Sequence, residues 1–124
     1  MREIKNHIIH CSDSDFGCVR EIRRWHQKRG FRDVGYHFII RQDGEIEIGR
    51  PLDEIGAHCK GFNTQSIGTC LIGRYNFTQQ QFKALKKLHN MLAKLFDGLT
   101  LQPHGHFNKR KTCPNFNPVE RVLK

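Results

Sequence analysis

Residues 66–73 have the sequence SIGTCLIG, which contains only apolar and small residues. A strand without a polar face is typical of the middle of a sheet that is covered on both sides and has parallel neighbours. We therefore predict a central strand over residues 66–73.

Four further stretches predict the strands around this one. Residues 5–11 (KNHIIHC) indicate a short buried strand, which the polar cluster at residues 12–15 ends. Residues 36–41 (YHFIIR) and 45–49 (EIEIG) flank Asp43-Gly44, which is the strongest short signal for a hairpin of antiparallel strands. Residues 99–101 predict a last short strand.

Helical spacing of apolar residues predicts two main helices. Residues 18–29 are amphipathic, with the polar cluster at 12–15 as the source of the N-cap and Gly30 as the C-terminal stop. Thr78 to Gln81 has the form of a capping box, and the helix after it presents one apolar face: Phe82, Leu85, Leu88, Leu92 and Leu95. We predict a loop over residues 102–116 and a short terminal helix from Asn117-Pro118.

Length and composition predict one domain over residues 1–124, and the charge limits the partners. Of the 124 residues, 21 are Lys or Arg and 12 are Asp or Glu, which gives a net charge of +9 that favours polyanionic partners. No run approaches the roughly 20 apolar residues of a membrane span, and MREIKN does not begin a signal peptide. We therefore expect synthesis in the cytoplasm without membrane insertion, and action outside only after lysis or another export route. Five cysteines cannot all pair, so at least one is a free thiol or a metal ligand.

Two imidazoles and a thiol suggest a metal site. His10 lies at the end of the first strand, and His104, His106 and Cys113 lie in the loop after the last one. Two His and one Cys suit Zn²⁺ and leave a fourth position open, as in catalytic sites. Taken singly, each of these residues is more often a packing residue than a ligand.

Three other side chains are candidates for the same cavity. Lys111 lies two residues before Cys113, so in an extended segment both point to one side. Tyr36 opens a strand and either presents its hydroxyl to the cavity or only packs. His58 is either an exposed loop residue or a substrate contact.

The chain resembles the type-2 N-acetylmuramoyl-L-alanine amidases, the zinc peptidoglycan amidases that share the peptidoglycan-recognition-protein fold, and in particular the small amidases of the T-odd phages. The matching segments follow one another along nearly the whole chain: residues 7–12, 19–26, 33–40, Asp43-Gly44, Gly49-Arg50, 56–58, Gly61, Asn63, 66–68 and 111–114.

This resemblance implies an α/β fold with a central mixed sheet flanked by helices, in a single domain without a separate wall-binding domain. It implies that His10, a loop histidine and Cys113 hold zinc and that Tyr36 and Lys111 assist catalysis. The family ligand usually follows Gly, which favours His106, whereas His104, nine residues before Cys113, stays the alternative.

The implied substrate is the amide between N-acetylmuramic acid and L-alanine in peptidoglycan. We expect a monomer and take His58 as the candidate substrate contact. A non-catalytic peptidoglycan-binding module and a metal-dependent peptidase that cuts elsewhere in the stem peptide are the alternatives. A basic nucleic-acid-binding domain is disfavoured, because no zinc-finger spacing occurs and the Phe residues follow core periodicity. Some phage members of this family also bind their own RNA polymerase, but the sequence does not support such a partner here, since only nine residues precede His10.

Overall fold

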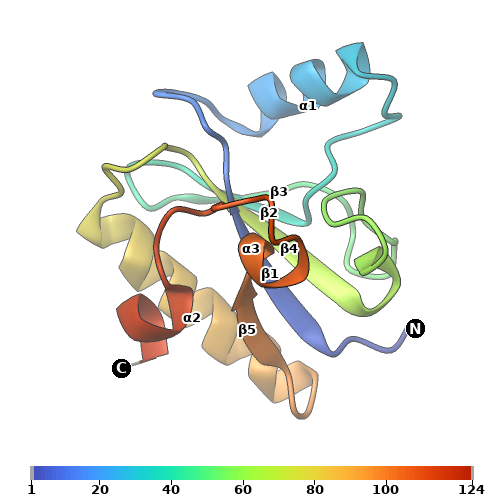
Figure 1. Cartoon of the computed structure of the whole chain (residues 1–124), viewed down its shortest axis with the longest axis vertical. Helices are drawn as coiled ribbons and strands as arrows, with labels where there is room; N and C mark the ends of the chain where they lie inside the picture. Colours follow the sequence, from blue (N-terminus) through green and yellow to red (C-terminus); the bar gives the residue numbers. More distant parts are fainter. Residues whose placement is uncertain (1, 124) are drawn as a thin grey trace.

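The computed structural model describes residues 2–123, which form one mixed sheet with helices on both faces (Figure 1). The strands are β1 (Asn6–Cys11), β2 (Phe38–Ile40), β3 (Ile46–Ile48), β4 (Ser66–Leu71) and β5 (Thr100–Pro103). The helical segments are α1 (Val19–Lys28), the 3-10 turn η1 (Asn63–Gln65), α2 (Gln79–Leu95), α3 (His104–Phe107) and the terminal turn η2 (Val119–Leu123).

The sheet has the order β3-β2-β4-β1-β5, so β4 is its middle strand, as predicted. β4 runs parallel to β1 and to β2, and β1 also runs parallel to β5. β2 and β3 form the predicted antiparallel hairpin around Asp43-Gly44. The mixed sheet implied by the resemblance is therefore confirmed.

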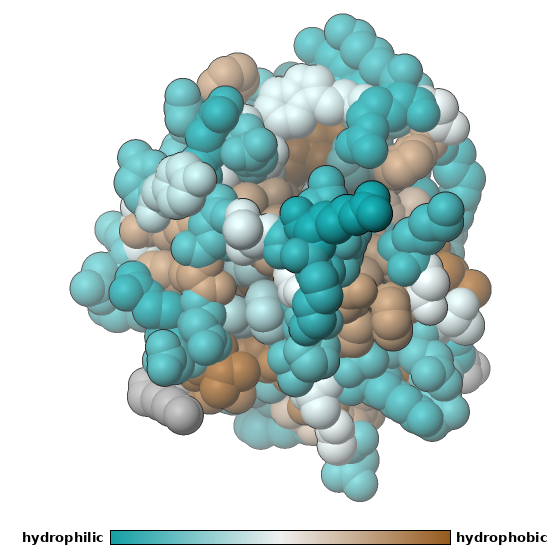
Figure 2. Space-filling model, viewed as in Figure 1, coloured by the Kyte–Doolittle hydropathy of each residue, from teal (hydrophilic) through white to brown (hydrophobic). Residues whose placement is uncertain are grey.

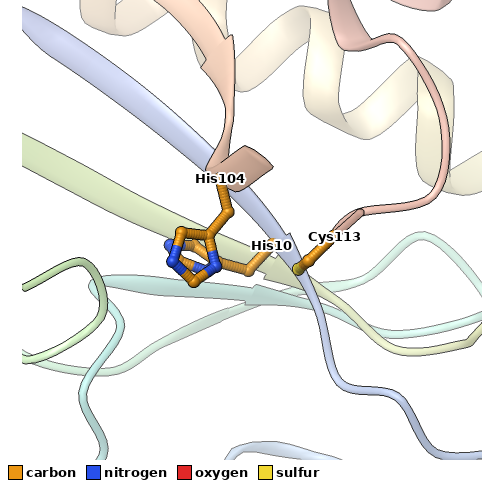
Figure 3. A group of neighbouring side chains, drawn as sticks. All are labelled: His10, His104 and Cys113. Carbon is orange, nitrogen blue, oxygen red and sulfur yellow. The ribbon is translucent and has the colours of Figure 1, made fainter. Parts of the chain in front are cut away.

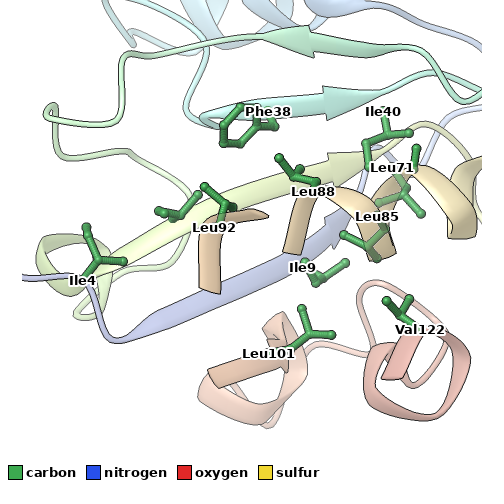
Figure 4. Close-up of a cluster of buried hydrophobic side chains, with 12 residues drawn as sticks. Ile4, Ile9, Phe38, Ile40, Leu71, Leu85, Leu88, Leu92, Leu101 and Val122 are labelled. Carbon is green, nitrogen blue, oxygen red and sulfur yellow. The ribbon is translucent and has the colours of Figure 1, made fainter. Parts of the chain in front are cut away.

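Two hydrophobic clusters fill the space on the two faces of the sheet. The cluster under α2 is the larger one and joins the sheet to the helix and to η2 (Figure 4): Ile4, Ile9, Phe38, Ile40, Ile67, Leu71, Ala84, Leu85, Leu88, Leu92, Leu101 and Val122. The smaller cluster lies under α1 and contains Ile22, Val34, Ile39, Cys70 and Ile72. Alternate side chains of β4 therefore pack into the clusters on opposite faces of the sheet, which explains why its sequence has no polar face.

The two main helices begin in different ways. At α2, the Thr78 hydroxyl accepts the Gln81 N–H (3.1 Å) and the Gln81 side chain accepts the Thr78 N–H (2.9 Å), so the predicted capping box is confirmed. The prediction that residues 12–15 cap α1 is wrong. The carboxylate of Glu47, on β3, instead accepts the N–H of Val19 at 2.9 Å. Glu47, 28 positions further along the chain than Val19, therefore caps α1 in place of the polar cluster that local spacing suggested.

Two smaller predictions also need correction. Leu95 is 65% exposed, although it continues the apolar spacing of α2. Residues 104–107 within the expected loop form α3. All five cysteines are free thiols, and Cys59 is buried. Within residues 2–123, no helix is long and apolar enough to cross a membrane.

A pair of histidines lies inside the core under α2. His7, on β1, is fully buried, and its Nδ1 lies 3.0 Å from Nδ1 of His89 on α2. Nε2 of His7 lies 2.7 Å from the hydroxyl of Thr69 on β4. Burial, with smaller effects from His89 and His37, lowers the pKa of His7 to about 3.

This lowered pKa predicts that acid destabilises the fold. An unfolded chain takes up a proton on His7 below about pH 6.5, whereas the folded chain does not until about pH 3. The His7 contribution to the free energy of unfolding is therefore complete above pH 6.5 and falls by about 1.4 kcal/mol per pH unit as the pH drops towards 3. We expect urea titrations across this range to show a shallower pH dependence for His7→Gln than for the wild type. His106→Gln is the matched control, because it removes an exposed imidazole, and an unchanged slope in His7→Gln would contradict the assignment.

Candidate active site

A cleft of about 780 Å³ lies at the carboxyl ends of β1 and β5. Apart from His106, every side chain selected from the sequence lines it: His10, Tyr36, His58, His104, Lys111 and Cys113. Hydrophilic residues dominate the face of the molecule shown in Figure 2, where apolar residues show at the bottom of a hollow beneath α1. The fold therefore brings together residues from five separate segments of the chain.

The pairing of β1 with β5 places two imidazoles side by side. In the parallel register, Ile9 lies opposite Pro103, so the next residues along both strands are His10 and His104. Their ring centroids lie 4.4 Å apart. His10 is 2% exposed, and His104 is half-buried at the start of α3.

Backbone contacts bring Cys113 to these imidazoles. Its carbonyl accepts the N–H of Gly105 at 3.0 Å, and its Sγ accepts the N–H of Cys11 at 3.0 Å. A Cβ at position 105 would lie 2.6 Å from the carbonyl oxygen of Lys111. Glycine between the two loop histidines therefore lets the segment with Lys111 and Cys113 pack closely against α3.

The three side chains converge as a cation site does (Figure 3). One potential ligand atom from each of His10, His104 and Cys113 lies within 4.8 Å of the other two. Zinc bonds of about 2.0–2.3 Å place tetrahedral ligand atoms about 3.5 Å apart, so a small closing movement suffices. Two imidazoles and one thiol form a donor set that suits zinc. The residues therefore fit such an ion.

His106 lies outside this group, whereas His104, the alternative left open by the sequence, belongs to it. Two residues along an α-helix correspond to a rotation of about 200°, so the side chains of His104 and His106 project in nearly opposite directions. The structure accordingly leaves His106 exposed while His104 faces His10. The strand register, and not the Gly-His pair, decides which imidazole meets His10.

Burial keeps both imidazoles of the group neutral. It lowers the pKa of His10 well below 6.5, and the nearby His58 and His104 lower it further. The pKa of His104 is lowered by burial and then by the positive charge of Lys111. The pKa of the Cys113 thiol is raised by its interaction with the Cys11 thiol and by burial. Neutral imidazoles offer lone pairs to a cation, and a bound cation stabilises a thiolate.

Tyr36 packs against His10, with 5.0 Å between the ring centroids. It precedes β2, which begins at Phe38, two residues later than predicted. The ring of His26, on α1, lies 5.4 Å from that of Tyr36, and its Nδ1 accepts the N–H of Gly35 at 2.8 Å. Burial raises the pKa of the Tyr36 hydroxyl well above 10, with a further contribution from nearby thiols. The phenol is therefore a hydrogen-bond donor at neutral pH.

Cationic side chains surround the mouth of the cleft. Arg29, Lys60, Arg110 and Lys111 line it, whereas Asp13 is the one carboxylate among its lining residues. Lys111 itself is exposed and close enough to lower the pKa of His104. The cleft therefore carries positive charge beside the proposed metal ligands.

His58 is neither a freely exposed loop residue nor only part of the cleft wall. It is half-buried, and its Nδ1 lies 2.9 Å from Nε2 of His10. Nothing in the sequence connects these two histidines, which are 48 positions apart. Nor was a role predicted for His26, although a polar residue on the apolar stripe of an amphipathic helix was a signal that it supports another group.

Comparisons with known proteins agree with this geometry. Residues 1–116 match the family described as N-acetylmuramoyl-L-alanine amidase. The endolysin of Escherichia phage T7 is 42% identical over 121 residues, which cover 89% of this chain and 80% of the endolysin.

Solved structures agree as well. The N-acetylmuramoyl-L-alanine amidase LysC from Clostridium intestinale superposes with a TM-score of 0.91 at 30% identity, covering 98% of this chain and 83% of LysC. Drosophila PGRP-LB, a peptidoglycan-recognition protein, gives a TM-score of 0.80 at 29% identity, covering 92% and 76%. The family match, the T7 endolysin and these structures show that the chain belongs to the N-acetylmuramoyl-L-alanine amidase family.

Proposed function

We propose that the chain hydrolyses the amide between N-acetylmuramic acid and L-alanine in peptidoglycan, with Zn²⁺ held by His10, His104 and Cys113. The convergence of these three side chains in one cleft is the observation that carries the proposal. Family membership supports the reaction, because the family is named for cleavage of this bond. The His-His-Cys donor set supports the choice of metal.

Both reactants, the amide and the attacking water, need activation in the step that forms the new bond. An amide is a poor electrophile and water is a poor nucleophile at neutral pH. Zinc, when bound, supplies a Lewis acid that polarises the carbonyl and activates water. The chain contributes the rigid end of β1, a fixed start of α3 and the docked segment with Cys113, which together orient the three ligands.

Tyr36 and Lys111 act on the carbonyl oxygen of the substrate as negative charge develops there. The phenol of Tyr36 remains protonated and donates a hydrogen bond from its hydroxyl. Lys111 supplies a positive charge at the mouth of the same cleft. Both groups stabilise the transition state more than the neutral amide, which is the condition for a rate effect.

We further propose that the protein acts on the bacterial cell wall. The T7 relative is a phage endolysin, which supports action of this chain on the bacterial wall after release from the cell in which it is made. All three metal ligands come from one chain, which supports a monomer as the active unit. Peptidoglycan is the partner, and the proposal includes neither a nucleic-acid partner nor insertion into a membrane.

The metal site predicts a sharp difference between the two loop histidines. We expect about one zinc ion per chain in the wild type and in His106→Ala, and little or none in His104→Ala or Cys113→Ser, by elemental analysis after dialysis. His106→Ala is the matched control, since it removes the same side chain two positions away in the same helix. Zinc retained in His104→Ala and lost in His106→Ala would reverse the assignment.

The catalytic roles predict loss of rate without loss of metal. Tyr36→Phe and Lys111→Ala should each lower turnover on purified peptidoglycan by about 10²–10³, as the removal of one oxyanion donor does. Zinc content and melting temperature should stay near the wild-type values, and the exposed Lys109→Ala should keep wild-type turnover. Wild-type turnover in Lys111→Ala would exclude it from the mechanism.

The bond that the enzyme cuts can be identified directly from the released fragments. Mass spectrometry of the fragments released by the wild type should show free L-alanine amino termini and intact muramic acid lactyl groups, and a metal chelator should stop their release. Fragments cut within the stem peptide would show a peptidase instead. Wall binding without any fragments would show a non-catalytic binding module.

A further inference from the structure

His58 connects a proposed metal ligand to the central strand of the sheet. Nδ1 of His58 lies 2.9 Å from Nε2 of His10, and Nε2 of His58 lies 3.3 Å from the hydroxyl of Ser66, the first residue of β4. The two rings meet edge to face, at an interplanar angle of 90°. The three side chains thus form one chain of polar contacts that starts at the metal site and ends at β4.

The proton positions along the contacts between His10, His58 and Ser66 follow from the number of donors and acceptors on each ring. A neutral imidazole carries one N–H and one lone pair, so a contact between two ring nitrogens needs a donor and an acceptor. If His58 donated to Nε2 of His10, the His10 proton would have to sit on Nδ1, and neither nitrogen of His10 would be free for a cation. If His10 donates from Nε2, its Nδ1 lone pair is free and the proton of His58 points from Nε2 to Ser66. Only the second arrangement is compatible with His10 as a ligand.

The surrounding backbone holds the ring of His58 in this position. A Cβ at Gly68 would lie 2.6 Å from ring atoms of His58, and a Cβ at Gly56 would lie 2.7 Å from its Cδ2. The side-chain oxygen of Asn63 accepts the N–H of His58 at 3.0 Å and that of Cys59 at 2.8 Å. Two glycines make room for the ring and one asparagine fixes the loop, so the position of His58 is built into the fold.

We propose that His58 is a positioning residue that accepts the Nε2 proton of His10 and so keeps the Nδ1 lone pair of His10 available to the metal ion. The inference rests on the proposed metal site and gives His58 a role that acts through His10, in place of the substrate contact expected from the sequence. Partners of this kind fix both the tautomer and the orientation of a ligand histidine.

Two substitutions at position 58 separate this role from simple packing. The side-chain oxygen of Asn takes nearly the place of Nδ1 and can accept the His10 proton, whereas Leu fills similar space without an acceptor. We expect His58→Leu to weaken zinc affinity by about 10–100-fold, the usual cost of losing such a partner, in competition with a chromophoric chelator. His58→Asn should restore affinity to within a few-fold of the wild type. His106→Leu, the matched control, should bind zinc like the wild type.

The outcomes distinguish this inference from the proposed function. If the wild type binds no zinc, the metal site fails. If the wild type binds zinc and His58→Leu binds it equally tightly, the metal site stands and the role of His58 is refuted. Equal weakening in His58→Asn and His58→Leu would reduce His58 to a packing residue.

A second measurement does not depend on the folding of any variant. Nitrogen-15 spectra of the histidine rings in the metal-free wild type should show the His10 proton on Nε2 and the His58 proton on Nε2. A proton on Nδ1 of His10 would overturn the inference.

Discussion

The parallel pairing of β1 between β4 and β5 is the constraint on which the rest of the molecule depends. Ile9 lies opposite Thr69 on one side and Pro103 on the other, so the end of β1 is fixed from both sides. That register brings His10 beside His104, which then positions the short helix against which the segment with Cys113 docks. A slip of one residue would turn every side chain of β1 to the opposite face, and the cleft and the core would be lost together.

Strand β1 carries two histidines that have different roles. His7 and His10 are three positions apart on β1 and point to opposite faces of the sheet. His7 meets His89 and Thr69 in the core under α2, whereas His10 meets His104 and His58 in the cleft. Burial keeps both rings neutral. In the core a neutral ring satisfies hydrogen bonds, and in the cleft it offers a lone pair, so the difference in role comes from the neighbours and not from the protonation state.

Positive charge is concentrated around the mouth of the cleft. The net charge of +9 is a property of the whole chain, but Arg29, Lys60, Arg110 and Lys111 gather around this one opening. Positive potential at the mouth of a cleft raises the local concentration of anionic ligands. Close to the proposed ligands, the positive charge of Lys111 also helps to keep His104 neutral.

Features that depend on residues close together in the chain were predictable from the sequence alone. The apolar run of β4, the Asp43-Gly44 hairpin and the capping box at Thr78 each depend on spacing within a few positions, and the structure has all three. The family motifs identified the mixed sheet and the amidase reaction. Only the tertiary structure placed His104 rather than His106 beside His10, supplied Glu47 as the cap of α1 and brought His58 next to His10. These contacts link segments 28 to more than 90 positions apart, and their geometry depends on strand register and on the rotation along a helix. Neither quantity can be read from the local spacing of residue types. The fold and most residues of the cleft were therefore predictable from the sequence, whereas the loop histidine that meets His10 and the contacts between the site residues were not.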